Sequence, residues 1–218
     1  MKKIICLVTA VLMTGILCGC GEEKHEPDEK TTSSVSEVKD SKEKSESSDE
    51  IRTVSSSLYS PLSFDEWGSA AKFSADKQKY FNVPIRVVKV SAGENAEKRV
   101  KDFCAAEKTY TYKNPEKGCH WVVADYEMNL DGFPAGKGGV DTEIVSFVTG
   151  TDGKELEYKN KKFAVSTICM TDGKYYFEGT GKGSIAFIVP EKFIDYTISL
   201  GEYGETQAFF TQSKKSVL

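Results

Sequence analysis

The sequence predicts an all-β sandwich of about seven to nine strands with one short helix inserted after an early strand. Three observations point to this class. Apolar residues alternate with polar residues over short runs, and turn sequences such as Asp152-Gly153 and Asp172-Gly173 separate these runs. Only the window 93–107 has helical periodicity.

The first strand is expected at residues 80–92. Phe81 and Val83 begin an alternating pattern that changes phase at Val88, which predicts a bulge. Proline has no N–H for a sheet ladder, so Pro84 predicts that this strand lies at an edge or at a bulge.

The helix is expected directly after this strand. Its apolar residues recur at helical spacing on one face, namely Ala96, Val100, Phe103 and Cys104. Two ion pairs at i,i+4 spacing lie on the other side, Glu94 with Lys98 and Glu97 with Lys101. The pattern predicts an amphipathic helix that packs on a sheet.

Residues 119–130 give the clearest strand. One face is apolar and carries Val122, Ala124, Tyr126, Met128 and Leu130. The other face is mixed and carries Trp121, Val123, Asp125, Glu127 and Asn129. A glycine-rich loop follows at 131–140. The remaining strands are expected at 141–150, 154–158, 163–170, 174–178, 184–189, 193–200 and 205–212.

The amino-terminal residues have the plan of an exported lipoprotein. Lys2 and Lys3 form a positive region, and the apolar run 4–17 is short for the roughly 30 Å core of a bilayer. Leu17-Cys18-Gly19-Cys20 resembles a lipobox, which implies cleavage before Cys20 and a diacylglyceryl thioether on its sulfur. Two acyl chains give stable anchoring. We therefore expect a lipid-anchored protein on the extracellular face of the cell membrane.

The sequence predicts three regions: a signal peptide at 1–19, a lipidated cysteine with a disordered polar linker at 20–56, and a domain at 57–218. Residues 21–56 contain no aromatic side chain and carry eleven acidic and six basic residues. A flexible coil of this length spans roughly 30–35 Å. The linker is interpreted as a spacer, or as a stalk that lifts the domain off the membrane.

The domain has a nearly neutral charge. The chain holds 33 acidic and 29 basic residues; the linker takes 11 and 6 and the leader two lysines, which leaves 22 and 21. This balance argues against nucleic acid as a partner, because nucleic-acid binding requires a basic face. Cys104, Cys119 and Cys169 permit at most one disulfide. A Cys104–Cys119 bridge would close the shortest loop, and buried free thiols are the favoured alternative.

Four sequence motifs occur in an order that resembles a family of Gram-positive bacterial lipoproteins with an immunoglobulin-like β-sandwich domain of unknown function. The motifs are Gly93-Glu94-Asn95-Ala96, then Pro115-Glu116-Lys117-Gly118 before Trp121-Val122-Val123, then Asp152-Gly153-Lys154, and finally Gly183-Ser184-Ile185-Ala186-Phe187-Ile188-Val189-Pro190. The resemblance covers about residues 68–202 and implies an immunoglobulin-like fold at the cell surface. The loop at 132–139 and the tail after Leu200 depart from the pattern. The resemblance supplies no catalytic residues.

The residues that carry hydrolytic chemistry are scarce in the domain. His120 follows Cys119 in a strand, so the two side chains point to opposite faces and do not form a nucleophile–base pair. Asp125 and Glu127 share a face, which leaves a glycan hydrolase as the least favoured alternative. Carboxylates beside the glycine loop, Asp131, Asp141 and Glu143, lack the spacing of a calcium loop. We expect no enzyme activity, no cofactor and no metal.

Aromatic residues are the best functional signal in the sequence. Tyr110, Tyr112 and Trp121 lie close together along the chain and are predicted to form a recognition surface. Packing of these rings inside the domain or against a sheet edge is the competing interpretation. We expect a non-enzymatic binding module for an envelope protein or a wall glycan. The alternative is an accessory or inhibitory subunit of another envelope protein.

Overall fold

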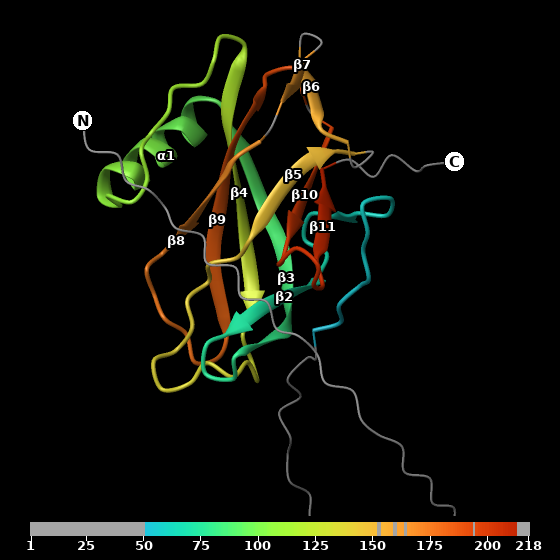
Figure 1. The fold of residues 1–218 in the computed structure, drawn as a ribbon, viewed down its shortest axis with the longest axis vertical. Coiled ribbons are helices and arrows are strands. Elements are labelled where there is room, and N and C mark those ends of the chain that lie inside the picture. Colours follow the sequence, from blue (N-terminus) through green and yellow to red (C-terminus); the bar gives the residue numbers. More distant parts are fainter. Residues whose placement is uncertain (1–50, 152–153, 159–160, 164, 194, 213–218) are drawn as a thin grey trace, which may run out of the picture. The chain divides into compact units, whose positions relative to one another are not determined.

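The computed structural model describes residues 51–151, 154–158, 161–163, 165–193 and 195–212 (Figure 1). The predicted signal peptide, Cys20 and most of the predicted linker lie outside the described residues. Main-chain contacts with the domain begin before residue 57, because Val54 donates its N–H to the Trp67 carbonyl at 2.8 Å.

Nine of the described strands form two sheets. The four-stranded sheet has the order β1-β11-β10-β5, formed by Leu62–Ser63, Ala208–Thr211, Tyr196–Leu200 and Ser146–Gly150. The five-stranded sheet has the order β2-β3-β4-β9-β8, formed by Gly68–Ser74, Lys79–Ala92, Cys119–Asn129, Thr180–Pro190 and Thr167–Thr171. β6, Leu156–Tyr158, pairs antiparallel with β7, Lys161–Phe163. Within the two sheets, the β1–β11 pair is parallel and the other pairs are antiparallel.

The hydrophobic core lies between the two sheets. The predicted apolar face of β4 contributes Val122, Tyr126 and Met128, all of which are buried. The four-stranded sheet contributes Ile198 of β10 and Phe210 of β11 to the same cluster. Because side chains of both inner faces share one core, the predicted all-β sandwich is confirmed.

The helix α1, Glu94–Ala106, packs on the other face of the five-stranded sheet (Figure 1). Ala96 and Val100, two of the residues on its predicted apolar face, contact Trp121 and Val123 of β4 in a second buried cluster. The sheet is therefore covered on both faces along the upper part of β4. This explains why the outer face of β4 is apolar at Trp121 and Val123 and charged further along.

The irregularity predicted in the first long strand is confirmed, but it lies beyond Pro84, and β3 is not an edge strand. The register of β3 against β4 shifts between Val87 and Lys89. β3 lies between β2 and β4, so Pro84 is in an interior strand. The ladder with β4 begins only at Ile85, so Pro84 stands beside the end of that neighbour.

Several predicted strands differ from the structure. The 141–150 strand is regular only over β5, because Thr142 is turned into the core and its carbonyl accepts the Tyr126 hydroxyl at 2.5 Å. The 163–170 strand divides into β7 and β8. No regular strand forms at 174–178, where Tyr176 makes one isolated bridge with Val140. This segment contributes little to the hydrophobic core, because Tyr175 and Phe177 are exposed. That explains why the predicted strand does not form there.

The sequence also misplaces the glycines before the 184–189 strand. Gly181 and Gly183 lie inside β9, which therefore begins earlier than expected. A Cβ on Gly183 would stand 2.3 Å from the Tyr126 hydroxyl oxygen, so glycine is required by a close approach rather than by a turn. The two first strands, β1 and β2, were not predicted, because small residues such as Ala70 and Ala71 hide their pattern.

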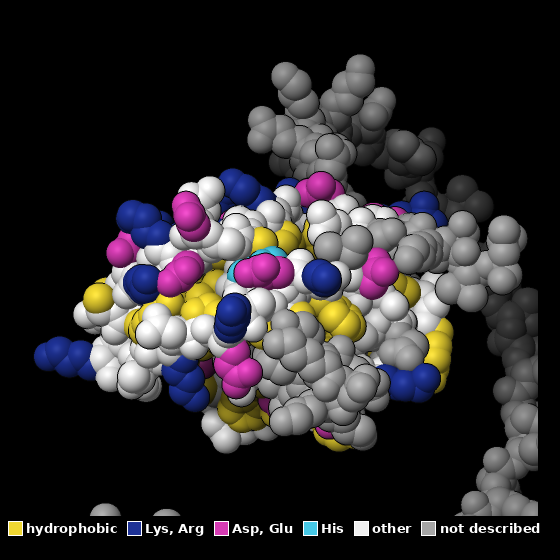
Figure 2. Space-filling view, turned by 90° about the horizontal axis from the view of Figure 1, so that it is seen from above, with side chains coloured by type: hydrophobic (Ala, Val, Ile, Leu, Met, Phe, Trp, Pro, Cys, Tyr) yellow, Lys and Arg dark blue, Asp and Glu magenta, His cyan; other side chains and the backbone are white. Residues whose placement is uncertain are grey.

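Cysteine and charge follow the expectations for a free-thiol, nearly neutral domain. Cys104, Cys119 and Cys169 are free thiols, of which Cys119 is buried and the other two are partly buried. At the end of the domain seen in Figure 2, basic and acidic side chains are interspersed with hydrophobic ones. In the part of the chain that the structure describes, no helix is long and apolar enough to cross a bilayer.

Candidate functional site

The predicted aromatic surface is built partly from buried rings. Trp121 lies on the outer face of β4 and is only 4% exposed. Its indole N–H donates to the Lys113 carbonyl at 3.2 Å, which ties the segment after α1 to the sheet. The Tyr112 ring packs beside it, with ring centroids 6.2 Å apart. Trp121 is therefore a wall of the site and not an exposed platform.

Tyr112 is held by helix α1. Its hydroxyl donates to Glu97 at 2.7 Å, and the Lys101 ammonium lies 5.1 Å from the centre of its ring. Lys101 also pairs with Glu97 at 2.7 Å. The hydrogen bonds from Lys101 and then from Tyr112 lower the pKa of the Glu97 carboxyl. These contacts make Tyr112 a brace between the helix and Trp121.

Tyr110 and Trp121 line a cavity of about 430 Å³, here named the aromatic cavity. Its other apolar walls are Ile168 of β8 and Ile188 of β9. Polar side chains at its margin include Ser166 and Lys113. A cavity of a few hundred Å³ with apolar walls and a few polar groups is typical of a ligand site.

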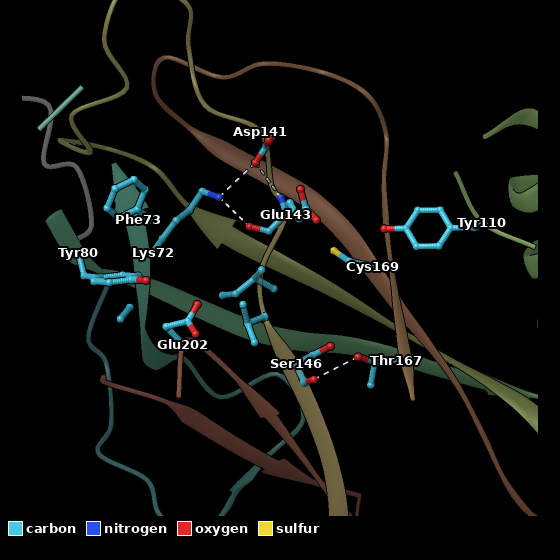
Figure 3. Close-up of a pocket in the computed structure, with 13 residues that line it drawn as sticks. Lys72, Phe73, Tyr80, Tyr110, Asp141, Glu143, Ser146, Thr167, Cys169 and Glu202 are labelled. Carbon is cyan, nitrogen blue, oxygen red and sulfur yellow. Dashed lines mark hydrogen bonds and ion pairs between the residues drawn. The ribbon is translucent and has the colours of Figure 1, made fainter. Parts of the chain in front are cut away.

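A second cavity of about 410 Å³ lies on the other side of β8 and is shown in Figure 3. It is here named the acidic cavity, because three carboxylates line it together with a single amine. Those four residues are Asp141, Glu143, Glu202 and Lys72. Aromatic rings complete its walls, including Phe73 and Tyr80, whose ring centroids are 5.3 Å apart.

Lys72 is the most buried charge of this cavity, at 7% exposure. Its ammonium donates to Asp141 at 3.2 Å and to the Glu143 carbonyl at 2.7 Å (Figure 3). The ammonium neutralises one carboxylate. The carboxylates of Glu143 and Glu202 then give the cavity a net charge of −2. This is the excess of three carboxylates over one amine. The cavity therefore favours a cationic group.

Tyr110 is shared by the two cavities. Its ring packs on Phe103 of α1, with centroids 5.5 Å apart, and in Figure 3 its hydroxyl points toward Cys169. Burial raises the pKa of Tyr110, so the hydroxyl stays neutral and able to donate. Of the three predicted residues, Tyr110 is thus the one that touches both cavities.

Cys169 lies on the inner side of β8, where burial outweighs the neighbouring groups that lower the pKa of its thiol. The Tyr126 hydroxyl is 3.4 Å from its sulfur, and burial raises the pKa of the Cys169 thiol. A raised pKa keeps the thiol protonated and weakly nucleophilic. Burial also raises the pKa of Tyr126 well above its usual value. These groups support the packing under β8 rather than nucleophilic chemistry.

The two carboxylates considered for glycan hydrolysis line a third cavity of about 530 Å³. Asp125 is held by the two guanidinium nitrogens of Arg99, at 2.6 and 3.1 Å, and by the Ser184 hydroxyl at 2.6 Å. Glu127 accepts two bonds from Arg86, at 2.7 and 3.1 Å, and pairs with Lys182 at 3.3 Å.

These ion pairs determine what the third cavity can do. The Arg86 hydrogen bonds hold the pKa of Glu127 below its ordinary value, against the effect of burial. A general acid for glycoside cleavage needs a raised pKa. Glu127 thus lacks the raised pKa that this mechanism requires, and the ion pairs bridge β3, β4, β9 and α1.

Of the three carboxylates beside the glycine loop, Asp141 and Glu143 line the acidic cavity and Asp131 does not. Asp131 accepts the Gly179 N–H at 2.7 Å, and Asp141 is engaged by Lys72. Among the described residues, no group of three or more His, Cys, Asp or Glu side chains is placed to hold a metal ion.

Sequence reasoning missed several walls of the two cavities. Ile168 and Ile188 join Trp121 because β8 pairs with β9 and β9 with β4, which no local pattern reveals. Lys72 was missed because β2 was not predicted. The alternation within the predicted 163–170 strand was the one available signal for Ile168. Comparison of the chain with protein-family models, with curated proteins and with solved structures finds no match.

Proposed function

We propose that this chain is a lipid-anchored cell-surface binding module, held by Cys20 on the extracellular face of the membrane, that recognises an envelope protein or a wall glycan without enzymatic turnover. The observation that carries the proposal is the placement of Tyr110 between an aromatic and an acidic cavity. Aromatic anchors in desolvated pockets dominate recognition energies. The immunoglobulin-like lipoprotein family that the sequence motifs resemble is consistent with such a role.

The binding proposal is tested with the full chain in its native membrane. Partners are captured by cross-linking and affinity purification, and a glycan array is probed in parallel. We expect Tyr110→Ala to weaken capture by about tenfold or more, because it removes the wall that both cavities share. Tyr175→Ala is the matched control, since Tyr175 is 67% exposed and lines neither cavity. Equal capture by both variants would contradict the proposal.

The same experiment addresses the alternative role. Recovery of one stoichiometric membrane protein, dependent on Tyr110, would make the chain an accessory or inhibitory subunit of that protein.

The anchor has its own test, which is labelling with a fatty-acid analogue. The label is expected on Cys20 and absent from Cys20→Ala, and persistence in that variant would refute the anchor.

A further inference from the structure

β8 is an edge strand of the five-stranded sheet. It pairs with β9 on one side, over Thr167–Thr171. On its other side, the described residues make no main-chain hydrogen bond to it. An open strand edge presents N–H and C=O groups that can pair with another extended chain.

Main-chain hydrogen bonds between β4 and β9 determine which residues of β8 face that open edge. The Leu130 N–H donates to the Gly179 carbonyl, and the Glu191 N–H donates to the Gly118 carbonyl. Main-chain groups alternate in direction along an antiparallel strand. By this alternation, even-numbered residues of β4 form main-chain hydrogen bonds with odd-numbered residues of β9. The even residues of β9 are therefore directed at β8, where Ala186 opposes Ile168 and Ser184 opposes Met170. It follows that Thr167, Cys169 and Thr171 present their N–H and C=O groups at the open edge.

The side chains of β8 alternate between the two cavities. Thr167 and Cys169 line the acidic cavity, whereas Ser166 and Ile168 line the aromatic cavity. Side chains that oppose one another across neighbouring strands lie on the same face of a sheet. A strand added to β8 would therefore send successive side chains into the acidic and the aromatic cavity in turn.

The two cavities favour different side chains of a bound partner. The acidic cavity has the net charge of −2 described above and suits a lysine or arginine. The aromatic cavity, with Trp121, Ile168 and Ile188 as walls, suits an apolar side chain. Tyr110 borders both, so its ring would contact either kind.

We propose that the open edge of β8 binds an extended polypeptide segment by strand addition, with basic side chains in the acidic cavity and apolar side chains in the aromatic cavity. The proposal rests on the binding function above and names the class of partner. A second copy of this chain paired through its own β8 does not meet the requirement. The strand reads Thr167-Ile168-Cys169-Met170-Thr171 and offers no basic side chain.

The probe is a library of random dodecapeptides displayed on phage and selected on the full chain. We expect the enriched peptides to alternate basic and apolar residues. Synthetic versions are then methylated on every second amide nitrogen, in either phase. Methylation in the phase that faces β8 is expected to weaken binding by about tenfold or more, and methylation in the other phase to leave it unchanged, because only the first removes edge hydrogen bonds.

Two pairs of protein variants locate the bound peptide. Both substitutions at Thr167 remove its hydroxyl bond to Ser146, but only Thr167→Pro also removes the outward N–H. Thr167→Pro should therefore bind about tenfold more weakly than Thr167→Val. Thermal unfolding of both variants checks that β8 is retained. Glu143→Gln with Glu202→Gln should weaken binding several-fold and reduce its salt dependence. Glu178→Gln is the control, an exposed carboxylate that lines neither cavity.

The outcomes separate the two proposals. Equal effects of the two methylation phases, or equal binding by Thr167→Pro and Thr167→Val, would overturn strand addition. Enrichment of no peptide, together with Tyr110-dependent binding on the glycan array, would also overturn it while leaving the binding module intact. Capture that is indifferent to Tyr110→Ala would instead overturn the binding module itself.

Discussion

At one edge of the five-stranded sheet the chain covers β2 with its own loop, whereas at the other edge β8 has no such cover among the described residues. Ala71 of β2 donates its N–H to the Thr206 carbonyl at 2.7 Å. Beside β8, the contact from β5 is made through a side chain, the Thr167 hydroxyl to the Ser146 carbonyl at 3.1 Å. Exposed edges invite unwanted pairing, so proteins protect them. The β8 edge has a cavity on each face and no main-chain partner among the described residues, as the strand-addition proposal requires.

The inner face under β8 depends most strongly on Gly183. A Cβ there would lie 2.3 Å from the hydroxyl oxygen of Tyr126, a fully buried ring in the core. Gly183→Ala is therefore expected to lower the free energy of unfolding by about 3 kcal/mol, at the upper end of overpacking effects. Urea unfolding measures the change.

The control for this substitution is Gly138→Ala. A Cβ at Gly138 would meet nothing within 4 Å, so this variant should unfold like the parent. If Gly183→Ala also unfolds like the parent, β9 tolerates a side chain at this position. The close approach of Tyr126 would then not explain the glycine.

The cover over β2 depends on Gly201. Its φ of +126° disfavours a side chain, and a Cβ would lie 2.5 Å from the Thr206 carbonyl oxygen that Ala71 uses. Gly201→Ala should destabilise the domain by about 2 kcal/mol and speed hydrogen exchange at the Ala71 amide. This change would make the β2 edge resemble the β8 edge.

Gly204→Ala separates backbone strain from the contact with Thr206. Gly204 also has a positive φ, of +87°, but a Cβ there would enter open space. It should cost only about 1 kcal/mol and leave Ala71 exchange unchanged. Faster exchange at Ala71 in both variants would argue against a specific cover.

The Arg86–Glu127 ion pair lies on the outer face of the five-stranded sheet, away from both edges. Its removal should have the smallest effect on stability. The folded pKa of Glu127 is lowered by Arg86, so its stabilisation is present above the unfolded pKa and is lost as pH falls through the folded value. Glu127→Gln should cost about 1 kcal/mol near pH 7 and nothing in strong acid. Urea unfolding from pH 3 to 7 measures this, with Glu178→Gln as control. A loss that does not change with pH would contradict the ion-pair explanation.

The sequence predicted the sandwich and the helix because both depend on local periodicity. The alternation in β4 and the 3.6-residue pattern of Ala96 and Val100 each match a buried face in the structure. The glycines of β9 misled the prediction, because their cause is Tyr126, a residue far away in sequence.

The site was predicted only in part for the same reason. Tyr110 and Trp121 come together because one segment follows α1 and leads into β4. Ile188, Lys72 and the open edge of β8 depend on strand order, which local sequence does not encode. The N–H and C=O groups of Thr167, Cys169 and Thr171 point away from β9. This can be worked out only from the register of β4, β9 and β8.

The most direct measurement is residue-resolved amide hydrogen exchange on the full chain without partner. We expect Ile168, Met170 and Ala71 to exchange slowly, because their N–H groups are bonded to β9 or to Thr206. Thr167, Cys169 and Thr171 should exchange at least about tenfold faster, since no main chain among the described residues accepts their N–H groups. Uniform protection of all five β8 residues would contradict an open edge, and with it the strand-addition site.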